Sequence, residues 1–244
     1  MNGNNNKKIT VVIASYKYGH LAAHCIESIL SQTRIPDRIL FVDDGIGDCN
    51  HLPKIYKNVE YVLRKKNLGT VHNFQDMLDR VDTELCLFVG ADNWLRSDAI
   101  EKLLLTDADI VTYDIIVTGE IKDEIYEGFS EDMYNYQGDY YWKRNGLHHG
   151  SMMYNVAKAK KIGYKKLREG HAYTSEDLNL WNGMLADGAT VEYIKEGLLY
   201  YRRHKENYNK YGKYYKSKDS DLHPIMKKIK KIYYKVRYNY TIVD

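Results

Sequence analysis

An acidic side chain stands just after a long apolar run near the middle of the chain. Leu85 to Val89 are five consecutive apolar residues, and Asp92 follows them after Gly90 and Ala91. A run of this length, bounded by polar residues and glycine, predicts a strand of a parallel sheet that is covered on both faces. Because ligands bind at the carboxyl ends of such strands, Asp92 could hold a divalent cation against a phosphate group. The alternative is a turn aspartate that caps the following helix.

Two earlier strands are also predicted to end in polar residues. Residues 8–16 form a β-branched run that ends in Ser-Tyr, and residues 38–45 form a second run that ends in Asp-Asp-Gly. If all three strands run parallel in one sheet, their polar ends gather along one edge. Chance explains such a series poorly, so this edge is the predicted site.

The rest of the chain predicts strands that alternate with helices. We expect helices at 20–33, 70–80, 97–105, 155–162 and 175–185, and further strands at 59–64, 110–118, 150–154 and 191–201. A polar, tyrosine-rich excursion or hairpin is expected at 119–138. Strands separated by helices of this length indicate βαβ units. The predicted fold class is α/β, with a mainly parallel central sheet flanked by helices.

Composition places the chain among ordinary globular proteins. It has 244 residues, of which 44% are hydrophobic and 28% charged, and no apolar run approaches the roughly 20 residues of a membrane span. The N-terminus lacks a signal-peptide core. The three cysteines are an odd number without metal-like spacing, which favours reduced thiols. We therefore expect a cytoplasmic protein.

Positive charge is concentrated in the last forty residues. Residues 205–244 contain 11 Lys or Arg and 4 Asp or Glu, and apolar residues at offsets of three and four predict an amphipathic helix. This Tyr- and Lys-rich tail could contact an anionic surface such as lipid headgroups or nucleic acid. It could also be a solvated helix face, or pack against the sheet or a second subunit.

Together these segments resemble the family 2 glycosyltransferases, nucleotide-sugar-dependent enzymes of the GT-A fold. The matching motifs are Val11–Tyr16, Ile39–Gly45, Asn67–Gly69, Ser175–Trp181 and Tyr201–His204, in the family's order. The resemblance covers residues 8 to about 205. It implies a GT-A domain over 1–204, with a nucleotide-sugar half at about 8–118 and an acceptor half at about 119–204. The amphipathic tail at 205–244 would be an appendage.

The donor that such an enzyme uses is a nucleotide diphosphate sugar. Asp44 can accept a hydrogen bond from the imide N–H of uracil, which favours a UDP-sugar, and Asp43 could instead support the turn. The alternative is that both acids only organise the turn before Gly45. Arg64 could reach the base or a phosphate, or be a solvated strand-end charge. The expected nucleotide-sugar site contains Ala14, Ser15, Tyr16, Asp43, Asp44, Arg64, Asn67, Gly69, Ala91, Arg202 and Arg203.

The resemblance also implies a metal cofactor, Mn²⁺ or Mg²⁺, that neutralises the leaving diphosphate. Asp92 matches the second acid of the family's Asp-x-Asp motif, whereas Gly90 stands where the first acid would be. His204 is the expected second ligand, although a lone histidine is more often a packing residue. Arg202 and Arg203 could donate to phosphate oxygens. Alternation along a strand argues against both pointing into the cleft.

Asp177 stands where the family positions its catalytic base, and Glu176 is the alternative. An acid in the first turn of a helix is also what capping alone would select. One base and one displacement imply inversion of the anomeric configuration without a covalent intermediate.

The acceptor is left open by the sequence. Aromatic and histidine side chains of the acceptor half could stack on sugars or on unpaired bases: Tyr126, Tyr134, Tyr136, Tyr140, Tyr141, Trp142, His148 and His149. A saccharide or glycolipid acceptor would place the tail at a membrane surface. A nucleic-acid acceptor, such as a hydroxylated base in DNA, would place its lysines on phosphates.

Two other classes of protein also remain open. One is an inactive GT-A-like binding protein that uses its tail for nucleic acid or a partner. Gly90 keeps this class open, because a metal motif without its first acid is what loss of activity would produce. The other is a nucleotidyltransferase, which shares the nucleotide-binding architecture. Asp92, Asp177 and His204 argue against the first class. Against the second class, the sequence has no glycine-rich phosphate loop with a lysine near residue 15.

Overall fold

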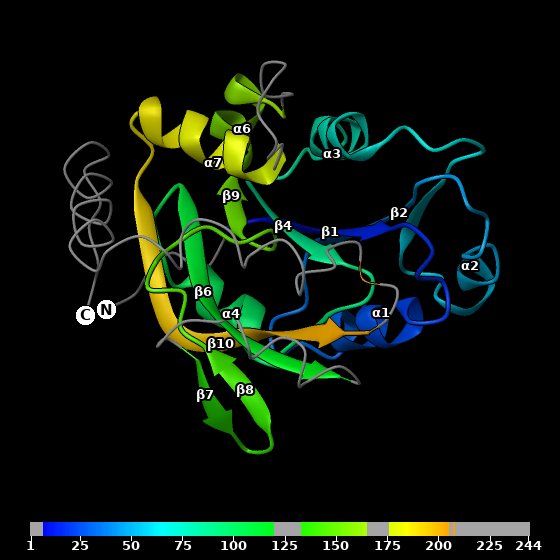
Figure 1. The fold of residues 1–244 in the computed structure, drawn as a ribbon. Coiled ribbons are helices and arrows are strands. Elements are labelled where there is room, and N and C mark those ends of the chain that lie inside the picture. Colours follow the sequence, from blue (N-terminus) through cyan, green and yellow to red (C-terminus); the bar gives the residue numbers. More distant parts are fainter. Residues whose placement is uncertain (1–6, 120–132, 165–175, 205–206, 208–244) are drawn as a thin grey trace, which may run out of the picture.

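The computed structural model describes residues 7–119, 133–164, 176–204 and 207, which form helices around one sheet (Figure 1). The main path of the ten-stranded sheet is β3-β2-β1-β4-β9-β6-β10-β5, and the β7–β8 hairpin joins it through β6. The strands are β1 (Ile9–Ser15), β2 (Arg38–Asp43), β3 (Glu60–Leu63), β4 (Leu85–Gly90), β5 (Trp94–Leu95), β6 (Ile110–Gly119), β7 (Met133–Tyr136), β8 (Asp139–Trp142), β9 (Met153–Asn155) and β10 (Val191–Arg203). The helices are α1 (Ala22–Leu30), α2 (Leu52–Ile55), α3 (Thr70–Asp79), α4 (Ala99–Leu104), α6 (Val156–Ile162) and α7 (Glu176–Ala186).

The directions of the strands place the polar ends predicted from the sequence at one edge. β1 pairs parallel with both β2 and β4, as expected. β9 is antiparallel to β4 and to β6, and β10 is parallel to β6, so β6 and β10 run in the same direction as β4. The carboxyl ends of β1, β2, β4 and β10 therefore share one edge, and the prediction of a mainly parallel α/β sheet is confirmed.

Helices cover both faces of the sheet (Figure 1), which explains the continuous apolar runs. In β1, Val11 and Ile13 face the layer of α1 and α4, whereas Val12 faces the layer of α3 and α7. All three side chains are fully buried. Each contributes about 1.5–3 kcal/mol by leaving water. A polar substitution on either face of β1 would therefore destabilise the scaffold of the site.

Several element boundaries differ from those expected. The strand expected at 150–154 is β9, and the helix after it begins at Val156 because Asn155 is its N-cap, accepting a hydrogen bond from the Lys158 N–H at 3.1 Å. The helix expected at 97–105 is shorter, since Asp98 and Leu105 are its cap residues, and Trp94 and Leu95 before it form a strand that pairs with β10. The short helix α2 was not expected, since four residues show no periodicity.

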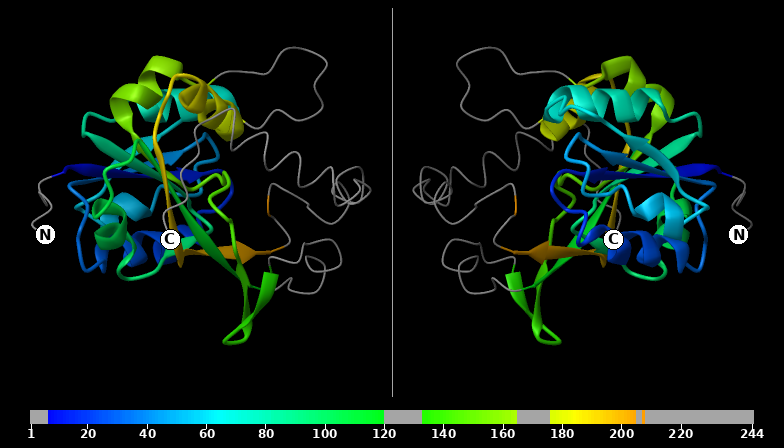
Figure 2. Two further views of the ribbon diagram at one scale, coloured as in Figure 1. Left: turned by 90° about the vertical axis from the view of Figure 1, so that its left-hand side faces the viewer. Right: turned by 90° about the vertical axis from the view of Figure 1, so that its right-hand side faces the viewer.

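The expected excursion at 119–138 is described only in part. The hairpin of β7 and β8 pairs with β6 and extends away from the helices (Figure 2). It continues to Trp142, four residues past the expected end. Residues 120–132 and the tail at 208–244 lie outside the described residues, so the tail helix stays a prediction.

Candidate active site

Asp44, directly after β2, is a buried carboxylate that anchors a neighbouring loop. Its Oδ1 accepts the Leu68 N–H at 3.0 Å, and its Oδ2 accepts Nδ2 of Asn67 at 2.9 Å. Gly45 makes this approach possible: its φ is +88°, and a Cβ there would lie 2.3 Å from the backbone of Lys66. The Asp-Asp-Gly and Asn-x-Gly motifs therefore act together as one turn against one loop.

Arg64 lies between this turn and helix α3. Its guanidinium is 3.5 Å from Asp44 Oδ1 and donates to Asp76 Oδ2 at 2.6 Å and to Asn73 Oδ1 at 3.2 Å. Only 10% of the side chain is exposed, so it is not a solvated strand-end charge. Because Asp76 and Asn73 hold it from behind, Arg64 presents a fixed positive charge next to Asp44.

Asp43 organises the turn instead of facing an open pocket. It is fully buried, and its carboxylate accepts the Gly47 N–H at 3.0 Å and the Ile46 N–H at 3.4 Å. Burial raises the pKa of this carboxyl. The two adjacent acids therefore have different roles. Asp43 stabilises the turn after β2, and Asp44 binds the loop after β3.

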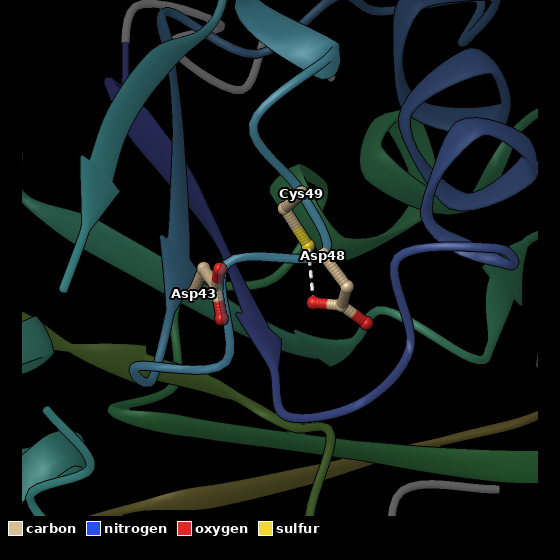
Figure 3. A group of neighbouring side chains, drawn as sticks. All are labelled: Asp43, Asp48 and Cys49. Carbon is tan, nitrogen blue, oxygen red and sulfur yellow. Dashed lines mark hydrogen bonds between the residues drawn. The ribbon is translucent and has the colours of Figure 1, made fainter. Parts of the chain in front are cut away.

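One cluster near this turn offers atoms that could bind a metal ion, all within 4.8 Å of one another (Figure 3). It consists of Asp43, Asp48 and Cys49. Asp48 Oδ2 accepts the Gly19 N–H at 2.8 Å, which ties the loop after β2 to the loop after β1. Burial raises the pKa of the Cys49 thiol to about 12, so the thiolate that metals bind is disfavoured. Loop organisation accounts for this group.

The loop after β1 places the remaining residues of the nucleotide-side prediction. Ser15 is buried, with its Oγ 3.4 Å from Cys49 Sγ, so this hydroxyl faces the Asp48 loop. Ala14 is half-buried, and its carbonyl accepts the N–H of the fully buried Ala91 at 2.9 Å. Tyr16 is 37% exposed at the sheet edge. Of this group, Tyr16 is the side chain best able to contact a ligand.

Asp92 and His204, the two metal ligands predicted from the sequence, lie close together at the sheet edge. Asp92 Oδ2 lies 3.3 Å from His204 Nε2, and both side chains are buried. Asn207 was not singled out from the sequence: its Nδ2 donates to Asp92 Oδ2 at 3.1 Å, and its Oδ1 accepts the His204 N–H at 2.8 Å. Spacing alone gave no signal for it.

Gly90 has a structural reason to lack a side chain. A Cβ there would lie 2.7 Å from Asp92 Oδ1 and 2.9 Å from Asn93 Nδ2. The Asp92 carboxylate therefore occupies the space that a side chain at position 90 would enter.

Arg202 and Arg203 point to different surroundings, as alternation predicts. The Arg202 guanidinium lies 4.8 Å from the centre of the Trp94 ring, and its Nη2 is 2.7 Å from His24 Nδ1. Arg203 is buried beside Tyr201. Arg202 is thus held against α1 and β5 by the Trp94 and His24 rings.

Asp177 and Glu176 begin helix α7. Asp177 Oδ1 accepts the Leu178 N–H at 2.8 Å, and its Oδ2 is 3.3 Å from His148 Nε2. A Cβ on Gly150 would lie 3.0 Å from Asp177 Oδ2. Because Gly150 precedes β9, which is antiparallel to β4, Asp177 lies at the same edge as Asp92. Burial, with a smaller effect of Asp177, raises the pKa of Glu176 to about 7.

A buried acid that was not predicted supports this side of the site. Asp114, within the apolar strand β6, accepts the hydroxyls of Tyr193 at 2.7 Å and Tyr141 at 3.0 Å and the Arg144 N–H at 2.5 Å. The sequence signal that could have identified Asp114 is a single acidic residue within an apolar strand. Asp114 joins β6, the β8 end and β10, and so fixes the start of the loop that carries His148.

A curled, mainly parallel sheet with acidic residues after its parallel strands is the architecture of GT-A glycosyltransferases. Residues 10–163 match the family described as Glycosyl transferase family 2, so the chain belongs to that family. The family expected from the motifs is therefore confirmed.

Two curated relatives are similar over part of the chain. Glycosyltransferase GlyA of Streptococcus pneumoniae is 27% identical over 101 residues, covering 39% of this chain and 14% of that protein. Teichoic acid poly(glycerol phosphate) polymerase of Staphylococcus epidermidis is 29% identical over 99 residues, covering 38% of this chain and 14% of that protein. The matched part is therefore a small share of each curated relative.

A solved structure shares the fold. S. aureus TarS 1-349 in complex with UDP-GlcNAc has a TM-score of 0.62 and 15% sequence identity, covering 81% of this chain and 59% of that one. The same fragment in complex with UDP has a TM-score of 0.60. At this identity the likeness establishes the fold.

None of the helices in the described ranges combines the length and apolar character needed to cross a bilayer.

Proposed function

We propose that this chain transfers a sugar from a UDP-sugar to an acceptor hydroxyl, with inversion at the anomeric carbon and a divalent cation. The contact between Asp92 and His204 carries the proposal. It brings a carboxylate and an imidazole from two distant strand ends to the edge that also holds Asp44 and Asp177. An inactive binding protein would have no need to keep these four groups at one edge.

Asp44 supports uridine as the nucleotide. Each of its carboxylate oxygens accepts one hydrogen bond from the loop after β3, and each keeps a second lone pair. That lone pair can accept the imide N–H of uracil, and the Arg64 guanidinium lies 3.5 Å from Oδ1 of the same carboxylate. The TarS fragment has been crystallised with UDP and with UDP-GlcNAc, which favours the same donor class here.

Asp92 and His204 would hold Mn²⁺ or Mg²⁺. A carboxylate oxygen and an imidazole nitrogen from separate strands, 3.3 Å apart and buried, fit one ion better than they fit a surface role. The imidazole favours Mn²⁺ over Mg²⁺, because Mg²⁺ prefers oxygen ligands alone. When bound, the cation neutralises the charge that develops on the leaving diphosphate.

Asp177 is the proposed base. The acceptor oxygen attacks the anomeric carbon, the bond to the diphosphate breaks with its electron pair on the diphosphate, and the hydroxyl proton moves to the Asp177 carboxylate. A single displacement of this kind inverts the configuration. Glu176 remains the alternative, since a pKa of about 7 is within the range that suits a general base at neutral pH.

The proposed acceptor is a saccharide or glycolipid, at a cytoplasmic membrane surface that the basic tail would contact. A curated relative that polymerises a teichoic acid poly(glycerol phosphate) makes an envelope polymer a reasonable acceptor class. A nucleic-acid acceptor would need the tail lysines on phosphates. Parallel assays that offer either vesicles with anionic lipid or a duplex with hydroxylated bases distinguish these two acceptor classes.

A donor screen tests the proposal. Melting temperature is measured with UDP-, GDP-, dTDP- and CMP-sugars, each with Mn²⁺ and with EDTA. We expect stabilisation by a UDP-sugar that depends on Mn²⁺, followed by UDP release when the acceptor is added. Equal shifts with all four nucleotides, or shifts that survive EDTA unchanged, would contradict the nucleotide and the metal respectively.

A further inference from the structure

His148 packs against the helix that carries the proposed base. Its Nε2 lies 3.3 Å from Asp177 Oδ2, and its ring meets the Trp181 ring edge-on at 6.0 Å between centres. Asp177 and Trp181 are four residues apart on α7, so they lie on one side of the helix. The histidine therefore docks across one helical turn.

The loop around His148 is anchored on both sides. The Arg144 side chain donates to the His148 carbonyl, and the Arg144 N–H donates to the buried Asp114. His149 is buried with its ring edge-on to Tyr113 at 4.6 Å. The position of the His148 ring is thus set by the fold.

The Nε2 atom of His148 is buried, and its N–H is not directed at any acceptor among the described residues well enough for a hydrogen bond. Asp177 Oδ2 is within ion-pair distance, so a small rotation of the ring completes the contact. Gly150 makes room for it, since even a Cβ there would press on the same oxygen at 3.0 Å. A buried donor beside a carboxylate needs that partner, because an unsatisfied buried group costs about 1–3 kcal/mol.

We infer that His148 is a positioning residue for Asp177, an inference that rests on the proposed function of Asp177 as base. The Leu178 N–H holds Oδ1, and the His148 ring N–H holds Oδ2 once a small rotation brings it into hydrogen-bond geometry, so that both oxygens of the carboxylate are then fixed. His148 keeps its own proton in the reaction. The proton of the acceptor goes to Asp177 and then to solvent.

The test uses two substitutions of His148 in the full chain. His148→Phe keeps a ring against Trp181 but removes the donor, and His148→Gln returns an N–H near the place of Nε2. UDP release from UDP-GlcNAc with Mn²⁺ and water as acceptor is followed over pH, with UDP affinity measured by calorimetry. We expect His148→Phe to lower kcat about 10- to 100-fold with UDP affinity within about twofold, and His148→Gln to restore most of the rate.

His51→Phe is the matched control, because His51 is an exposed histidine at the start of α2. It should leave kcat and UDP affinity unchanged. In an Asp177→Asn background, His148→Phe should cause no further loss of kcat, since a positioning residue acts only through the group that it positions. A full additional loss in that background would overturn the inference.

The failures of the inference and of the proposed function differ. Normal turnover in Asp177→Asn contradicts Asp177 as base, whereas a loss in Asp177→Asn together with normal turnover in His148→Phe overturns only the role of His148. Melting temperatures of the two single variants and the double variant give a readout that needs no turnover. Non-additive shifts support the contact, and additive shifts overturn it.

Discussion

Asp92 Oδ2 lies 3.3 Å from His204 Nε2, although 112 residues separate the two in the chain. One side chain follows β4 and the other follows β10, strands that run in the same direction on opposite sides of β9 and β6. The short strand β5, which directly follows Asp92 and Asn93, pairs with β10 and so brings the two ends together. Asn207 completes the cluster by donating to the same carboxylate oxygen.

Asp92→Asn should remove the dependence of UDP binding on Mn²⁺. In the unsubstituted chain we expect Mn²⁺ to raise UDP affinity about tenfold or more, equivalent to about 1.4 kcal/mol. The amide lacks the charge that the cation needs. Calorimetric titrations with Mn²⁺ and with EDTA measure the difference. Asp107→Asn is the control, since Asp107 is 95% exposed and remote from the edge; a retained Mn²⁺ effect in Asp92→Asn would refute the assignment.

Gly90→Ala should impair the metal site at a moderate cost in fold stability. The new Cβ would meet the ends of the Asp92 and Asn93 side chains, which can rotate away, and no backbone. Rotation of Asp92 breaks its contact with His204. We expect UDP affinity to become independent of Mn²⁺, while the free energy of unfolding falls by about 1–3 kcal/mol because buried hydrogen bonds of Asp92 and Asn93 are disturbed. Unchanged Mn²⁺ dependence would show that Asp92 binds from another rotamer.

Asn67→Ala should loosen the nucleotide side of the site. Asn67 donates to the Asp44 carboxylate and accepts the Gly69 N–H at 2.8 Å, so it links the turn after β2 to the start of α3. Loss of a hydrogen bond to a charged group at an exposed residue should cost about 1–2 kcal/mol in urea unfolding. UDP affinity should fall several-fold in calorimetry. Lys65→Ala in the same loop is the control, and equal losses in both variants would argue for a general loop effect.

Asp177→Asn should lower turnover by about 10²-fold or more while UDP affinity stays nearly constant. The amide keeps the size of the side chain and can still accept the Leu178 N–H. Only the capacity to take a proton is lost. A parallel fall in affinity would instead indicate that α7 has moved, and unchanged turnover would exclude Asp177 as base.

The strand ends could be predicted from the sequence because they depend on short, local patterns. The apolar runs into Ser15, Asp44 and Asp92 reveal buried strands, and parallel order then places their ends together. The sequence favoured Asp44 for the nucleotide and Asp43 for the turn, whereas the loop partners of each carboxylate depend on the pleat and the turn and needed the structure.

Contacts between distant segments were beyond the sequence. Asp92 and His204 were paired through the family resemblance, whereas Asn207 and Asp114 carried no motif. The contact of His148 with Asp177 depends on how a loop packs on α7, which no periodicity encodes. The antiparallel β9 and the two-residue β5 are similarly set by pairing partners and not by local propensity.

Glu176 should make the stability of the chain depend on pH. Burial raises its folded-state pKa to about 7, from an ordinary value of 4.5. A raised pKa means that the protonated form is favoured in the fold, so the stabilisation is fully present below about pH 4.5 and is lost as the pH rises through about 7. Glu176→Gln cannot ionise and should keep its stability over this interval.

The gain in unfolding free energy of Glu176→Gln over the unsubstituted chain should therefore grow from pH 5 to pH 8, as measured by urea unfolding at each pH. Glu84→Gln, at an exposed residue before β4, should show no such trend. A constant difference across the pH range would mean that Glu176 titrates alike in the folded and unfolded chain. In that case the folded-state pKa of Glu176 would lie near its ordinary value.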